Sequence, residues 1–174
     1  MTTIEKYIEL VFPIIEHCAI KSGKKGFQKE HIWYLNRQIF YGFGMYFSGH
    51  LYSEEAELKF NKLHSEYIQQ CRNANKEPLE ISIQTLNWGT QPLIDKGRKE
   101  LLFEHMYTGT MFRDDIKKLH ESEILTIQEI KKLATSKYKV CLITKSENQK
   151  LHKTQRGSYP LDYYAEQGIK IQHK

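Results

Sequence analysis

The chain has 174 residues and a formal net charge of +5, with 40% hydrophobic and 27% charged residues. This composition excludes an intrinsically disordered chain, and the length allows one full hydrophobic core but not two of comparable size. We therefore expect a single domain over residues 1–174. It divides most naturally into a helical lobe, residues 1–77, and an α+β lobe, residues 78–174, that would carry the site.

The positive charge makes nucleic acid a candidate partner. The excess of lysine and arginine is interleaved with 11 tyrosines, and cations hold phosphates while aromatic rings stack on bases. A basic protein without any polyanionic partner would carry the same net charge, so charge alone does not decide the question.

Cysteine usage and hydropathy bear on location. Cys18, Cys71 and Cys141 are odd in number, far apart and form no C-x-x-C pair, so the sequence indicates neither a disulfide framework nor a zinc ribbon, and a reducing cytoplasm is the simplest location. The N-terminus lacks the pattern of a signal peptide, and polar residues interrupt the aromatic-rich stretch 31–52. We expect no membrane association.

The N-terminal half is predicted to be helical. Thr2 and Glu5 are spaced as a capping box, and apolar residues then recur at helical steps up to Cys18, with Pro13 expected to kink or break the helix. Residues 28–52 are apolar nearly all round and predict a central core helix. Ser53, followed by two glutamates, predicts the start of another helix that ends at residues 72–78.

The C-terminal half mixes strands and helices. Residues 81–88 fit either a strand or a short helix, and the sequence does not decide between them. Residues 101–105 and 138–144 are predicted strands, and a helix is predicted near 111–120. Capping boxes at 126–129 and 146–149 predict two further helices, the second beginning at Ser146. The predicted fold class is α+β.

The candidate chemistry is concentrated where the first of these strands ends. Glu104 and His105 stand side by side after the apolar run 101–103, directly before a turn at Thr108 and Gly109. A buried strand can hold such a pair rigidly while the turn admits a ligand. The plain structural alternative is that both are hydrogen-bonded strand residues.

The order of these elements resembles the ββα-metal finger of the HNH endonuclease superfamily over residues 100–153. The resemblance rests on a strand ending in Glu104 and His105, a second strand, and a helix carrying Asn148 and His152. It implies that His105 is the general base, and that Glu104 with Asn148 or His152 holds Mg²⁺ or another divalent metal. Residues 106–137 would then be an insertion.

Under this interpretation Lys145 and Arg156 stabilise the phosphate charge. The implied activity is that of a metal-dependent endonuclease, a hydrolase of DNA phosphodiester bonds, in restriction, phage defence or a toxin system. DNA is favoured over RNA as the partner, and a homodimer is expected if duplex DNA is cut at symmetric sites.

Two alternatives remain open. A metal-independent ribonuclease of the toxin type would use an acid–base pair and a cation, for which Glu104, His105, Tyr107, Lys145 and Arg156 are suitable residue types. A basic protein that binds nucleic acid or another protein without catalysis would need none of these roles. Metal dependence separates the two enzymes, and full packing of Glu104 and His105 would favour the binding protein.

Overall fold

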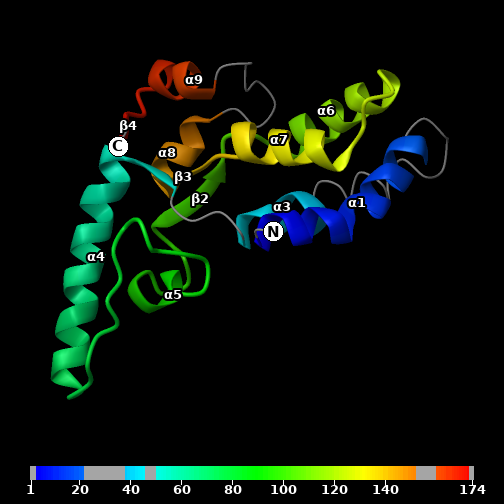
Figure 1. Ribbon diagram of the computed structural model, residues 1–174. Coiled ribbons are helices and arrows are strands. Elements are labelled where there is room, and N and C mark those ends of the chain that lie inside the picture. Colours follow the sequence, from blue (N-terminus) through cyan, green and yellow to red (C-terminus); the bar gives the residue numbers. More distant parts are fainter. Residues whose placement is uncertain (1–2, 22–37, 46–49, 152–159, 173–174) are drawn as a thin grey trace. The chain divides into compact units, whose positions relative to one another are not determined.

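The computed structural model describes residues 3–21, 38–45, 50–151 and 160–172 (Figure 1). The chain forms two compact units, and each unit is built from two separate segments. The first comprises Met1–Phe47 and Tyr107–Tyr138, and the second comprises Ser48–Met106 and Lys139–Lys174. The lobe boundary expected after residue 77 falls inside the second unit, where it marks the end of a helix.

The first unit begins with α1 (Thr3–Lys21). Its buried side chains include Ile8, Val11, Ile15 and Cys18, so one apolar stripe faces the interior. The helix continues through Pro13. Of the kink or break expected at Pro13, the break does not occur: proline removes one backbone donor, and the apolar stripe is packed on both sides of it.

The remaining elements of this unit enclose an aromatic core. They are α3 (Phe40–Gly42), the 3₁₀ helix η2 (Phe43–Met45), α6 (Gly109–Glu121) and α7 (Ile127–Lys137). Thr108 and Thr126 cap α6 and α7 through their side-chain oxygens. The rings of Phe40, Phe43, Phe112 and Tyr138 lie 5.1–6.1 Å apart in tilted and edge-to-face pairs.

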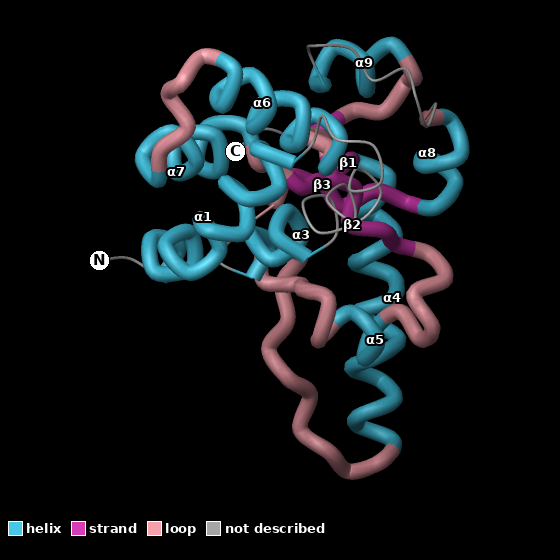
Figure 2. The backbone as a smooth tube through the Cα atoms, turned by 90° about the vertical axis from the view of Figure 1, so that its right-hand side faces the viewer, coloured by secondary structure: helices cyan, strands magenta, loops and turns pink. Residues whose placement is uncertain are grey.

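The second unit contains a four-stranded mixed sheet, which Figure 2 shows in magenta. Its strands are β1 (Leu51–Ser53), β2 (Leu101–His105), β3 (Val140–Thr144) and β4 (Ile171–Gln172), in the order β2-β3-β1-β4. β1 runs parallel to β3, and the other two pairs are antiparallel. The strands predicted at 101–105 and within 138–144 are confirmed, as is the α+β class.

The central helix predicted over residues 28–52 is wrong at its C-terminal end. Leu51 and Tyr52 belong to β1, where they pair with Cys141 and Leu142 of β3. Hydrogen bonding to a strand far away in the sequence therefore overrides the apolar pattern of this stretch. Residues 28–37 and 46–49 lie outside the described residues.

Each face of the sheet has its own apolar cluster. One face packs against α4 (Glu54–Asn73), which Ser53 caps as predicted, and against the segment containing α5 (Gln91–Ile94). The other packs against α8 (Lys145–Lys150) and α9 (Pro160–Glu166). Residues 81–88 form neither the strand nor the helix considered for them; they are turns and irregular backbone that contribute Ile81, Ile83 and Leu86 to the core beside α4.

Candidate functional site

Glu104 lies on β2 opposite Cys141, on the face covered by α8 and α9. The residue is only 7% exposed, and the hydroxyl of Tyr164 donates to its Oε1 at 3.5 Å. Around it pack apolar side chains that include Met106 and Ile143. Glu104 is thus a carboxyl group inside a mainly apolar layer.

His105 ends the same strand opposite Val140 and is half-buried. Successive residues of a strand point to opposite faces of the sheet, so the side chains of Glu104 and His105 diverge. Adjacency in the sequence suggested one shared site, whereas the pleat separates the carboxyl group from the imidazole.

The structure places Lys145 away from His105. β3 ends at Thr144, which pairs with Leu101 at the start of β2, and α8 begins directly afterwards. Leu101 and His105 are four residues apart along β2, which corresponds to about 14 Å. The exposed Lys145 therefore lies at the opposite end of the strand pair.

The helix α8 turns back over the face that carries Glu104. Leu151, directly after this helix, packs with Met106 and Cys141. The C-terminal end of α8, the helix that carries the half-buried Asn148, therefore lies on the Glu104 side of the sheet. His152 and Arg156 lie outside the described residues.

The start of α8 differs from the prediction. The N-cap is Thr144 and not Ser146, and Glu147 completes the capping box. The buried Glu147 Oε2 accepts hydrogen bonds from Ser53 Oγ at 2.7 Å, Thr144 N at 2.8 Å and Thr144 Oγ1 at 3.0 Å. This carboxylate therefore joins β1, β3 and α8 and has a structural role.

The buried Cys141 pairs with Glu104 across the strands, and its thiol feels the charges of two buried carboxyl groups, those of Glu104 and Glu147. Burial raises the pKa of its thiol strongly, and the charges of Glu147 and Glu104 raise this pKa further. The thiol consequently stays protonated at neutral pH, which excludes Cys141 as an activated nucleophile.

Tyr107 belongs to the first unit and is buried there. Its hydroxyl donates to Asp115 Oδ2 at 2.7 Å, and Lys137 Nζ donates to the same oxygen at 2.8 Å. Burial, followed by the contact with Asp115, raises the pKa of the Tyr107 phenol far above its usual range. The structure thus gives this side chain a place in a partly exposed hydrogen-bond network with Asp115 of α6 and Lys137 of α7.

His50 is a residue that the sequence analysis did not single out. It directly precedes β1. When the parallel register of β1 and β3 is extended by one residue, His50 pairs with Val140 of β3, and Val140 pairs with His105 of β2 along the other edge of β3. The ring of His50 meets the ring of Phe103 edge to face at 5.1 Å. His50 and His105 therefore occupy the same face and the same end of the sheet, about 10 Å apart between Cα atoms.

The environment of His50 keeps its ring neutral. Burial lowers the pKa of His50, and a hydrogen bond with the backbone of Ile83 only partly offsets this. Its Nε2 is buried and has no hydrogen-bond partner among the described residues. The only feature of the sequence that could have pointed to His50 is its place just before a short β-rich run. The strand that pairs with this run, β3, lies about 90 residues further along the chain.

The metal site implied by the HNH resemblance takes Glu104 and Asn148 from the described part of the chain. Within that part, no three side chains of histidine, cysteine, aspartate or glutamate come together as a metal-binding group. None of the helices in the described ranges has the length and apolarity to cross a membrane.

Comparisons with protein-family models, with curated proteins and with solved structures give no match to this chain.

Proposed function

We propose that the protein is a nuclease that cleaves phosphodiester bonds with His105 as its general base. The observation that carries the proposal is the shared position of His105 and His50, on one face and at one end of the sheet. A neutral imidazole accepts a proton near pH 7, which is what activation of a water molecule or a ribose hydroxyl requires.

His50 is the second group of this proposed site. Its ring is neutral because it is buried, and its Nε2 is a buried nitrogen without a partner in the described part of the chain. Buried polar atoms of this kind are normally satisfied by an ordered water or a ligand hydroxyl. His50 is therefore suited to bind a hydroxyl of the substrate or an ordered water, while His105 removes the proton of the attacking hydroxyl.

RNA is the substrate that this pair of imidazoles favours. Attack by the 2′-hydroxyl of RNA needs proton transfer and charge stabilisation but no metal ion. Because Glu104 and His105 point to opposite faces, the acid–base chemistry is assigned to the two histidines and not to the adjacent pair.

A second candidate is the metal-dependent cleavage of DNA. It is favoured by the position of α8, the helix of Asn148, whose C-terminal end lies on the face that carries Glu104, since carboxylate and amide oxygens are the ligands that Mg²⁺ prefers. His152 completes the proposed ligand set, and Lys145 and Arg156 are the proposed cations. The bound ion would stabilise charge on the phosphate and lower the pKa of a water bound to it, because His105 points to the opposite face of the sheet.

The test is an incubation of the purified protein with total RNA and with plasmid DNA, each in EDTA, Mg²⁺ or Mn²⁺. Cleavage of RNA in EDTA supports the two-histidine site, and cleavage of DNA only with metal supports the second candidate. His105→Ala should abolish cleavage of RNA in EDTA, whereas the control His120→Ala, on α6, should leave it unchanged. Folded protein that cleaves neither substrate under any condition contradicts the proposal.

A further inference from the structure

A rigid turn joins α5 to β2. The buried carboxylate of Asp95 accepts backbone hydrogen bonds from Lys99 and Leu101, both at 2.9 Å, and a third from Glu100. Within this turn Gly97 and Arg98 adopt φ of 77° and 50°. Left-handed backbone is unfavourable for arginine, so the hydrogen bonds to Asp95 hold Arg98 in a conformation that it would not adopt by itself.

This conformation places Arg98 against an exposed tryptophan. The guanidinium carbon lies 4.0 Å from the centre of the Trp88 ring, and Nη2 donates to the Trp88 carbonyl oxygen at 2.8 Å. Trp88 nevertheless remains 61% exposed. Arg98 Nε is buried without a hydrogen-bond partner among the described residues. The contact therefore orients the indole while most of its surface stays open to a ligand.

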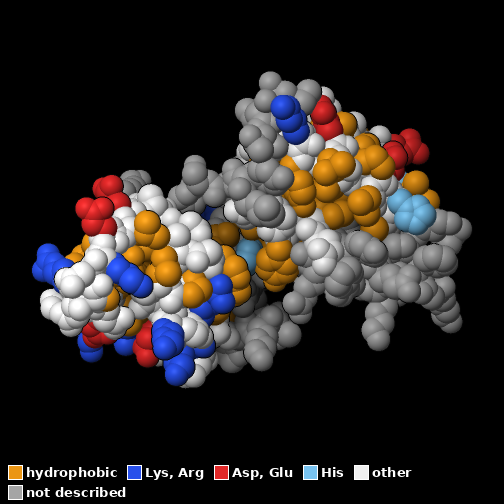
Figure 3. Space-filling model, turned by 90° about the horizontal axis from the view of Figure 1, so that it is seen from below, with side chains coloured by type: hydrophobic (Ala, Val, Ile, Leu, Met, Phe, Trp, Pro, Cys, Tyr) orange, Lys and Arg blue, Asp and Glu red, His pale blue; other side chains and the backbone are white. Residues whose placement is uncertain are grey.

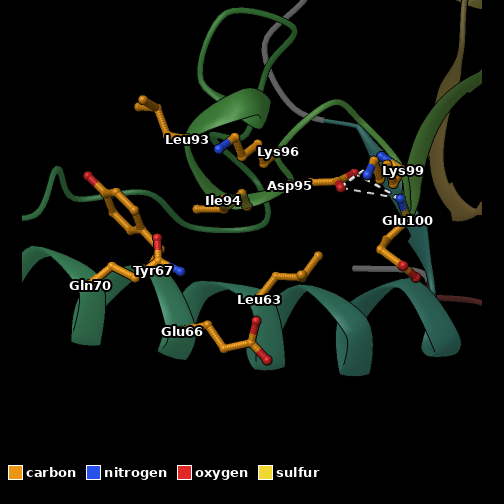
Figure 4. A pocket seen from close by; sticks show the side chains of 10 residues that line it. All are labelled: Leu63, Glu66, Tyr67, Gln70, Leu93, Ile94, Asp95, Lys96, Lys99 and Glu100. Atoms are coloured by element: carbon orange, nitrogen blue, oxygen red, sulfur yellow. Dashed lines mark hydrogen bonds between the residues drawn. The ribbon is translucent and has the colours of Figure 1, made fainter.

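A pocket of about 240 Å³ lies between α4 and the α5 segment, and its lining includes Lys96 and Lys99, which flank Gly97 and Arg98 in the turn. Figure 4 shows the ring of Tyr67, from α4, and the side chain of Lys96, from the α5 segment, on opposite sides of it. Leu63, Leu93 and Ile94 give the pocket an apolar part. It thus offers an aromatic ring, an apolar surface and an ammonium group at one place.

The lining of this pocket contains two lysines, Lys96 and Lys99, and three acidic residues, Glu66, Asp95 and Glu100. Lys96 and Lys99 line it, are exposed, and form no ion pair with a carboxylate of the described residues. Two of the acidic side chains in the lining have partners. Asp95 accepts backbone hydrogen bonds, and Glu100 forms an ion pair with Lys59 at 2.9 Å. Glu66 is the remaining acidic side chain of the lining.

The same mixture of chemistry is visible on the surface. In the space-filling view, lysine and arginine side chains lie among hydrophobic ones over the region of α4 and α5, on the left of Figure 3. Exposed apolar residues of this segment include Leu79, Trp88 and Leu93. Exposed aromatic surface next to unpaired cations is the combination that binds unpaired nucleotides, because their bases stack and their phosphates need countercharge.

We infer that Trp88, Arg98, Lys96, Lys99 and Tyr67 form a binding platform for single-stranded nucleic acid. In this platform a base stacks on Trp88, and the two lysines hold adjacent phosphates. Duplexes are bound more weakly because their bases are already stacked on one another. The inference rests on the proposed function for its choice of ligand and adds the surface through which a substrate strand is held.

The test is binding of a fluorescein-labelled 20-nucleotide oligo(U), measured by fluorescence anisotropy in EDTA. Trp88→Ala should weaken binding about 5- to 150-fold, the range expected for the loss of one stacked base. Trp88→Phe keeps an aromatic face and should recover most of the affinity. Both substitutions are at an exposed position, and a thermal melt of each variant verifies folding.

The lysines are tested through the salt dependence of the same binding. The double variant Lys96→Ala and Lys99→Ala should lower the slope of log K against log salt by about 1.4, which is two phosphate contacts on a single strand. The matched control, Lys117→Ala with Lys118→Ala on α6, removes the same charge and should leave the slope nearly unchanged. Equal effects of the two pairs would overturn the platform, as would the absence of oligonucleotide binding.

Failure of the platform can be told apart from failure of the nuclease. His105→Ala should bind oligo(U) like the wild type, because His105 is not part of the platform. If the wild type cleaves RNA and Trp88→Ala binds oligo(U) as tightly as the wild type, the platform is wrong while the nuclease proposal stands. Binding that depends on Trp88 in a protein without cleavage supports the platform and contradicts the nuclease.

Discussion

The three cysteines differ sharply in their surroundings, and this determines their reactivity. Cys18 and Cys141 are buried, while Cys71 is half-buried on α4. Burial raises the pKa of Cys18, and burial together with Glu147 and Glu104 raises that of Cys141. Both buried thiols are therefore protonated and shielded at neutral pH.

We predict that iodoacetamide at pH 8 modifies Cys71 in the native protein and leaves Cys18 and Cys141 unmodified. Mass spectrometry of tryptic peptides after quenching identifies the labelled residues. Full labelling of all three in urea is the control for peptide recovery. Modification of native Cys141 as fast as Cys71 would contradict the packing described around Glu104.

At the residue scale, the candidate site shows that two residues adjacent in the sequence need not share a site. Glu104 and His105 were recognisable from the sequence as an acid and a histidine at the end of a strand. The alternation of the strand also predicts that they diverge, but only the register reveals which helices cover each side. His50 could not be assigned at all, because its neighbourhood is created by the parallel pairing of β1 with β3.

Among the elements, α8 offers a direct test of the observed cap. Thr144 Oγ1 accepts from the backbone N–H of Glu147 at 3.1 Å, whereas Ser146 Oγ contacts Glu55 Oε1 and the Thr144 hydroxyl. Thr144→Ala should lower the free energy of unfolding by about 1–2 kcal/mol, and Ser146→Ala by about 0.5 kcal/mol or less. Urea denaturation measures both, and the reverse order would place the cap at Ser146.

The helices α6 and α7 are joined by Asp115, which makes stability depend on pH. Burial alone would raise the pKa of Asp115, but hydrogen bonds from Lys137 and Tyr107 outweigh it and lower the pKa below its usual value. A carboxyl group with a lowered folded-state pKa stabilises the protein above about pH 4, and this contribution is lost as the pH falls through the folded-state pKa.

We therefore predict that Asp115→Asn destabilises the protein at pH 7, and that its difference from the wild type shrinks as the pH falls below about 4. Urea denaturation of both proteins between pH 7 and pH 2.5 measures the difference. Lys117→Ala, also on α6, serves as a control for general charge effects. A difference that stays constant over this range would show that Asp115 does not contribute through its charge.

The helices and strands that could be predicted are those determined by residues close together in the sequence. Caps and β-rich runs predicted α4, β2 and β3 because hydrogen bonds and side-chain preferences within a few residues determine them. β1 was missed because only its neighbours in the sheet make it a strand. The irregular segment 81–88 packs against α4. Such packing leaves no local sequence pattern, so the conformation of this segment could not be predicted.

At the scale of the whole molecule, the chain builds each of its two units from two segments. The segment containing α6 and α7, predicted as an insertion between the two strands, belongs to the unit that also contains α1. The α+β class followed from the order of elements, but this division did not, because it depends on packing between residues far apart in the sequence. Both the proposed site and the proposed platform lie within the second unit.

The central claim is that His105 acts as the general base of a nuclease. The most direct measurement is the rate of cleavage of a fluorescent RNA in EDTA by the wild type, His105→Ala and the control His120→Ala. The account predicts that His105→Ala reduces the rate about 10²- to 10⁴-fold, with His120→Ala unchanged. Equal rates for the wild type and a folded His105→Ala would contradict it.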